Sequence, residues 1–146
     1  MSYKIEEIEG IGHARAEQLA NAGISTVENL MEKAASKNGR KEVAEASGIS
    51  ESQILTYVNM GDLMRINGVG GEFAELMVAS GVDTIKELRN RNAANLHAKM
   101  LEINEEKSLT RRVPSEEEIQ KFIDAAGELD PMVTHYAYSF TSRKAH

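Results

Sequence analysis

The chain has 146 residues, of which 41% are hydrophobic and 27% are charged, with a formal net charge of -6 and no cysteine. These values are typical of a globular domain, and they exclude disulfides, thiolate metal sites and a cysteine nucleophile. The sequence has no apolar run of membrane-spanning length and no secretory signal at its N-terminus, so we expect a cytoplasmic protein that does not enter a membrane.

The acidic balance also bears on nucleic-acid binding. Phosphate neutralisation supplies much of the affinity of a nucleic-acid-binding domain, and such domains are usually basic. The net charge therefore disfavours strong non-specific binding to DNA, while a local basic patch stays compatible with it.

The N-terminal part of the chain contains a segment that recurs later. Residues 8–30 read IEGIGHARAEQLANAGISTVENL, and residues 66–88 read INGVGGEFAELMVASGVDTIKEL, without a gap between the aligned copies. Every glycine of the first copy recurs in the second, and so do most apolar positions. This pattern indicates a duplicated supersecondary unit.

Each copy predicts a tight turn that leads into a helix. The turn consists of a glycine, an apolar residue and a second glycine: Gly10, Ile11 and Gly12, then Gly68, Val69 and Gly70. Two glycines in this arrangement permit positive φ and close approach of the backbone. Apolar residues follow at helical spacing in both copies, so we expect a helix after each turn.

A second short helix is predicted at the end of each copy. Gly23 and Gly81 suit the C′ position that ends the preceding helix. Ser25 and Asp83 stand where the next helix needs an N-cap, and Ser25 with Glu28 fits a capping box.

The doubled pattern h-x-G-h-G-x-x-x-A-x-x-L, followed by G-I-x-T-x-x-x-L, resembles the helix-hairpin-helix (HhH) motif, where h is apolar. It is similar to HhH units of DNA repair proteins, DNA ligases, polymerases and the C-terminal domain of the RNA polymerase α subunit. The whole chain resembles a family of small bacterial tandem-HhH proteins without an assigned function. The resemblance implies a helical fold in which hairpin backbone amides at a helix N-terminus hold a DNA phosphate.

Two further helices are predicted between the copies. Asn38-Gly39 signals a turn, a helix follows over residues 41–47, and Ser50 caps another helix that runs through Met60. The apolar spacing also fits a helix-turn-helix core. Because the candidate recognition helix has no Lys or Arg, we favour a plain αα-corner.

Two more helices are predicted after the second copy. Residues 92–104 carry one apolar stripe, and residues 107–113 are expected to form a loop. Ser115 and Glu118 fit a capping box that starts the last helix, which Gly127 ends. In the tail, Tyr136, Tyr138 and Phe140 alternate as in a strand, whereas Val133, Tyr136 and Phe140 fit a helix, and the aromatic content leads us to expect that this segment packs against another surface.

These elements predict an all-α fold. Two pseudo-repeated HhH units, each with two further helices, are expected to pack as one compact domain. We divide the chain into a first repeat with the αα-corner (1–60), a second repeat with two helices (61–130) and a C-terminal tail (131–146). A dinucleotide-binding loop is disfavoured because G-x-G-x-x-G fails at Arg15 and Phe73.

Candidate binding residues fall into two groups. The HhH resemblance implies phosphate contacts at both hairpins, by Gly10, Ile11, Gly12, His13 and Arg15 in the first and by Gly68, Val69, Gly70 and Gly71 in the second. A basic segment over residues 86–112 adds four arginines that suit a phosphate or an acidic partner: Arg89, Arg91, Arg111 and Arg112. The alternatives are that the glycines only permit tight hairpins and that the basic segment is a solvated face.

We therefore expect a non-catalytic binding module with weak, sequence-independent binding of nucleic acid, DNA above all. The alternative is a protein–protein interaction adaptor that uses the HhH fold as a scaffold, which the acidic charge and Glu72 in the second hairpin favour. The four histidines lack metal-ligand spacing, and no Ser/His/Asp grouping is evident. We accordingly expect no enzyme, no metal and no cofactor.

Overall fold

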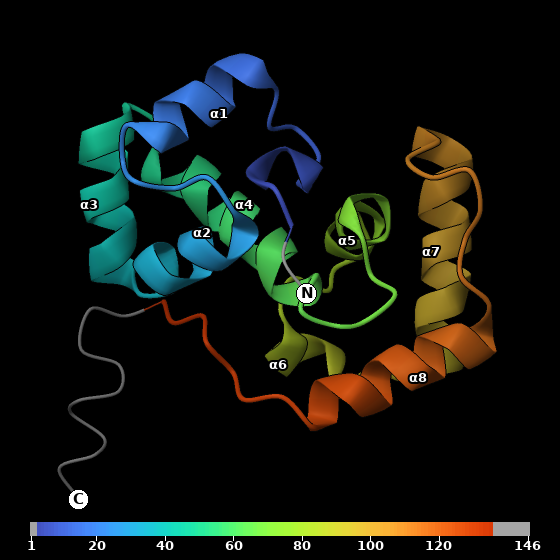
Figure 1. Ribbon diagram of the computed structural model, residues 1–146. Helices are drawn as coiled ribbons and strands as arrows, with labels where there is room; N and C mark the ends of the chain where they lie inside the picture. Colours follow the sequence, from blue (N-terminus) through green and yellow to red (C-terminus); the bar gives the residue numbers. More distant parts are fainter. Residues whose placement is uncertain (1–2, 136–146) are drawn as a thin grey trace, which may run out of the picture.

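A computed structural model describes residues 3–135, and within that range the fold is all-α (Figure 1). The regular elements are a short 3-10 helix and eight α-helices: η1 (Ile5–Glu7), α1 (His13–Ala20), α2 (Val27–Ala34), α3 (Lys37–Ser47), α4 (Glu51–Leu63), α5 (Gly71–Ala79), α6 (Ile85–Leu88), α7 (Ala93–Lys107) and α8 (Glu116–Gly127). The described residues contain no strand, only an isolated bridge between Lys4 and Thr26.

Helix α4 lies between the two halves of the described chain. It packs against α2 and α3 on one side and against α5 on the other, while α7 and α8 pack on each other at the far end (Figure 1). From Tyr57 to Leu63 every residue of α4 is buried. This stretch is mainly apolar, with Asn59 and Asp62 as its polar members, and its apolar side chains join both halves into one hydrophobic core.

The two copies of the sequence repeat have the same turn geometry. Gly10 has φ 94° and Gly68 has φ 95°, a left-handed conformation that glycine adopts without strain. The amides of Ile11 and Val69 close the two turns by donating to the carbonyls three residues earlier, at 3.1 Å in both copies. The predicted tight turns are therefore present.

The first helix of each copy also ends in the same way. Gly23 and Gly81 both have positive φ, and each donates its amide to a carbonyl three residues back. The following residues, Ile24 and Val82, donate to carbonyls five residues back, at 3.0 and 2.9 Å. This is the Schellman arrangement, in which a left-handed glycine satisfies the last carbonyls of a helix. The predicted C′ glycines are confirmed.

The predicted N-caps of the second short helices are wrong by one residue. The caps are Thr26 and Thr84, not Ser25 and Asp83. The Thr26 hydroxyl accepts from the Asn29 amide at 3.0 Å and the Asn29 side chain accepts from the Thr26 amide, so the capping box pairs Thr26 with Asn29. Threonine also satisfies a helix N-terminus, and tertiary contacts decide which of two neighbouring candidates does so.

The Asn38-Gly39 turn is also wrong, because both residues lie in the first turn of α3. Ser36 caps this helix by accepting from the Gly39 amide at 3.0 Å. A Cβ at position 39 would lie 2.0 Å from the carbonyl oxygen of Lys33. Glycine here serves close packing of α3 on α2, and this contact overrides the local turn preference.

The remaining helices agree with their predictions. Ser50 caps α4, which continues to Leu63, beyond the expected end. The buried residues of α7 are those of its apolar stripe, and α8 begins with the Ser115–Glu118 capping box. The predicted strand or helix at Tyr136, Tyr138 and Phe140 lies outside the described residues.

None of the helices in residues 3–135 combines the length and the apolar character that crossing a membrane requires.

Candidate functional site

The helices of the described chain differ in how their N-termini are capped. Helices α2, α3, α4, α6, α7 and α8 each begin with a Thr, Ser or Asn whose side chain accepts a backbone N–H. Helices α1 and α5 instead follow Gly12 and Gly70, which have no side chain to accept. Their first amides carry the partial positive charge of a helix N-terminus without a side-chain cap.

The first hairpin is open to solvent. A Cβ added at Gly10 or Gly12 would meet no atom within 4 Å. His13 is 88% exposed, and its Nε2 lies 3.5 Å from a carboxylate oxygen of Glu17. The structure therefore brings a glycine turn, the uncapped start of α1 and His13 together on one exposed surface.

Arg15 supplies the fixed positive charge at this hairpin. Its Nη1 lies 3.4 Å from the side-chain oxygen of Gln18, a neutral partner. Arg15 forms no ion pair with any residue in the described range, so no carboxylate there neutralises its charge. Ile11, by contrast, is buried, and its amide already donates to the Ile8 carbonyl within the turn.

The second hairpin is mostly covered. A Cβ at Gly68 would lie 3.1 Å from the Phe122 ring, and one at Gly71 would lie 2.1 Å from the Glu7 carbonyl oxygen. Val69 is fully buried, and only Gly70 has open space. The start of α5 thus packs against the segment that leads into the first hairpin.

Acidic side chains gather between the two hairpins. Burial, together with the nearby charges of Glu9 and Glu72, raises the pKa of Glu75. Glu72 lies in the first turn of α5, and the Cγ atom of Glu9 would lie 3.6 Å from a Cβ added at Gly71. These carboxylates make the surroundings of the second hairpin unfavourable for a phosphate.

Two of the four predicted arginines, Arg89 and Arg91, stabilise the second half of the molecule by donating to backbone carbonyls. An Nη2 of Arg89 donates to the Ala126 carbonyl at 3.0 Å and to the Leu129 carbonyl, at the end of α8. Arg91 donates to the Gly81 carbonyl at 2.8 Å and pairs with Glu87. Arg89 thus caps the end of α8 and Arg91 holds the turn after α5, structural roles that the sequence pattern does not distinguish from binding.

Arg112 forms an ion pair within the described chain, whereas Arg111 does not. Arg112 makes a bidentate ion pair with Glu118 at 2.7 and 2.9 Å and lies 5.4 Å from the centre of the Phe73 ring. This pair, with the Ser115 amide, lowers the pKa of Glu118 to about 2. Arg111 is exposed and has no partner among residues 3–135. The structure therefore does not present the four arginines as one free basic surface.

Two charged residues that the sequence pattern did not single out are buried. Asp62 is 1% exposed, and its carboxylate accepts from the Ile85 amide and from Arg65, both at 2.8 Å. Arg40 is 4% exposed and donates to the carbonyls of Ala34 and Ala35. A charge within an apolar helical run, as at Asp62, signals a buried partner, whereas Arg40 stands in a polar stretch without such a signal.

Comparison with known proteins gives a family and no characterised relative. Residues 9–129 match the family described as Domain of unknown function (DUF4332), so the chain belongs to that family. No curated protein and no solved structure matches the chain.

Proposed function

We propose that this member of the DUF4332 family is a non-catalytic nucleic-acid-binding module. Its two repeats are proposed to be HhH units, of which the first makes the principal contact. The backbone amides at the start of α1 hold one phosphate, Arg15 adds positive charge beside it, and His13 supplies a further side chain for hydrogen bonding. The observation that carries this proposal is the missing side-chain cap on α1 and α5, where every other α-helix of the described chain has one.

The surroundings of the two hairpins support a principal role for the first. Around Gly10 and Gly12 the backbone is open, and no acidic residue among residues 3–135 forms an ion pair with the neighbouring Arg15. At the second hairpin the Glu7 carbonyl covers Gly71, and the carboxylates of Glu72 and Glu75 repel a phosphate. Backbone contacts read no base sequence, so binding is expected to be sequence-independent. With few cations to neutralise phosphates, it is also expected to be weak.

Fluorescence anisotropy with labelled duplex and single-stranded DNA and RNA, at low and physiological salt, tests the proposal. We expect saturable binding at low salt that weakens as salt rises. Arg15→Glu should weaken binding about tenfold and make the salt dependence shallower, by about the contribution of one phosphate contact.

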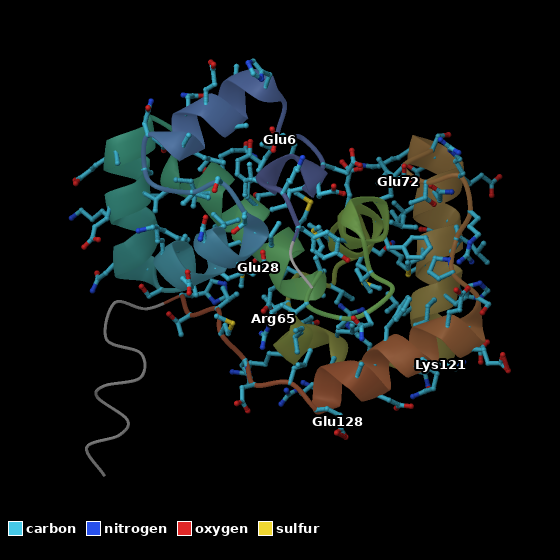
Figure 2. All side chains as sticks on the ribbon, viewed as in Figure 1. Glu6, Glu28, Arg65, Glu72, Lys121 and Glu128 are labelled. Atoms are coloured by element: carbon cyan, nitrogen blue, oxygen red, sulfur yellow. The ribbon has the colours of Figure 1, made fainter. Side chains whose placement is uncertain are left out.

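The matched control is Lys121→Glu, which makes the same charge change on an exposed residue of α8 (Figure 2). It should leave binding nearly unchanged. An equal loss of affinity in both variants would show that only the net charge of the protein matters, and it would contradict a site at the first hairpin. Absence of binding even at low salt would contradict the proposed function and favour the protein adaptor.

A further inference from the structure

A cavity of about 320 Å³ lies beside the first hairpin, between the two halves of the described chain. Its lining comes from the hairpin, from α4, from α5 and from the segment that ends and follows α7. The volume falls at the lower end of the range of small-ligand sites. Because Gly10 belongs both to the hairpin and to the wall of this cavity, a ligand held at the hairpin lies next to it.

One buried polar side chain of α4 opens onto this cavity. Tyr57 lines it together with the apolar side chains of Met60, Val78 and Leu109. Tyr57 is 3% exposed, and its hydroxyl forms no hydrogen bond with any residue in the range 3–135, yet protein atoms do not fully enclose it. Buried tyrosine hydroxyls usually find a hydrogen-bond partner, so this one points to a polar ligand in the cavity.

Charged groups of both signs line the same cavity. Glu9 and Glu75 offer carboxylates, and Lys107, at the end of α7, offers an ammonium group. None of the three forms an ion pair within residues 3–135. A simple amine would be repelled by Lys107, and a phosphate by the two carboxylates. A flat ring that carries both donors and acceptors along its edge suits this mixture, and nucleobases have that chemistry.

We propose that this cavity receives one unpaired nucleobase of the strand whose phosphate the first hairpin holds. The inference rests on the proposed function and deepens it, since a base that stays stacked in a duplex cannot enter a cavity. The carboxylates accept from N–H groups of the base, the Tyr57 hydroxyl bonds to its polar edge, and the apolar walls cover its faces.

This arrangement gives the site a preference among nucleic acids. Guanine suits the carboxylates best, because its adjacent N1–H and N2–H groups can both donate to one of them, whereas thymine has no amino group. The hairpin contact itself reads no sequence. The cavity adds to it a preference for single strands over duplexes and for guanine over thymine.

An NMR titration of the full chain, labelled with ¹⁵N and with ¹³C at the methionine methyl groups, tests this inference. The ligands are short DNA single strands of equal length: one is abasic throughout, and the others carry one guanine or one thymine at the centre of the same abasic backbone. We expect every strand to shift the amides of residues 12–15. The guanine strand should shift the Met60 methyl signal most, and Met100, which does not line the cavity, should not move.

Tyr57→Phe removes the hydroxyl and keeps the ring. It should weaken binding of the guanine strand about threefold or more and leave binding of the abasic strand unchanged. The matched control is Tyr3→Phe, which makes the same change at a tyrosine that does not line the cavity and should alter neither affinity.

The outcomes separate this inference from the proposed function. Shifts at residues 12–15 without a shift at Met60 would overturn the base-binding cavity alone. Equal shifts of Met60 with guanine and thymine, or equal losses in the two tyrosine variants, would also overturn it. The absence of shifts at residues 12–15 with every strand would overturn the proposed function, and the base-binding cavity with it.

Discussion

The ionised carboxylate of Glu75 lowers the stability of the folded state. It is partly buried on α5, and both this burial and the carboxylates of Glu9 and Glu72 raise its pKa. An acid whose pKa is raised on folding favours the folded state in its protonated form. That contribution is fully present below the ordinary pKa of glutamate, about 4.3, and is lost as the pH rises through the raised value.

Glu75→Gln should therefore raise the melting temperature at pH 7, because the glutamine carries no charge to repel. The gain should shrink as the pH falls and vanish below about pH 4, where the wild-type residue is protonated as well. Thermal unfolding followed by circular dichroism over a pH series measures this. Glu45→Gln, on an exposed part of α3, is the control and should show no such dependence. An equal gain at every pH would contradict a charge effect at Glu75.

At the scale of single residues, the sequence indicates backbone roles better than charge roles. Positive φ at Gly10, Gly23, Gly68 and Gly81 follows from the repeat itself, since only glycine takes this conformation freely. Whether an arginine is free depends instead on which carbonyls and carboxylates the fold brings to it. Arg89 reaches the end of α8, far along the chain, and no local pattern predicts that contact.

Among the helices, the least predictable feature was the position of the caps. Ser25 and Thr26 both suit an N-cap, and the choice depends on a distant contact, because the Val27 amide donates to the Tyr3 carbonyl at 2.9 Å. In the second copy the buried Asp62 carboxylate accepts from the equivalent amide, that of Ile85. The existence and order of the helices, which depend on apolar spacing, were predicted well.

The start of α5 offers a matched pair of substitutions. A Cβ at Gly71 would lie 2.1 Å from the Glu7 carbonyl, whereas one at Gly70 meets no atom within 4 Å and its φ is −95°. Gly71→Ala should cost about 1–3 kcal/mol of unfolding free energy, since the backbone segments must separate. Gly70→Ala should cost less than about 1 kcal/mol.

Urea denaturation of the two variants compares these costs directly. Similar midpoints would contradict the close contact between the start of α5 and η1. Loss of stability in Gly70→Ala but not in Gly71→Ala would also contradict this close contact.

The C-terminal segment ties the two halves of the described molecule together. Arg89 holds its beginning through the Leu129 carbonyl, and Arg40 holds its end through the Thr134 carbonyl. The Thr134 amide also donates to the Ala35 carbonyl at 2.9 Å. The segment runs from α8 back to α2 (Figure 1), a closure that helical periodicity does not predict.

Arg40→Met should release the end of this segment, because the carbonyls of Ala34, Ala35 and Thr134 lose a charged donor. We expect a loss of about 2 kcal/mol in unfolding free energy, and faster hydrogen exchange at the Thr134 amide. Lys41→Met, at the next, exposed position of α3, is the control and should change neither. An unchanged rate of hydrogen exchange at the Thr134 amide in Arg40→Met would contradict the role of Arg40 in holding this segment.

A ¹⁵N-resolved NMR titration with a short DNA duplex at low salt reports whether the amides at the start of α1 hold a phosphate. The amides of residues 12–15 should shift most, residues 70–73 clearly less, and added salt should reverse both changes. Arg15→Glu should reduce the shifts at residues 12–15. Shifts confined to other surfaces, or equal at both hairpins, would contradict a phosphate site at the start of α1.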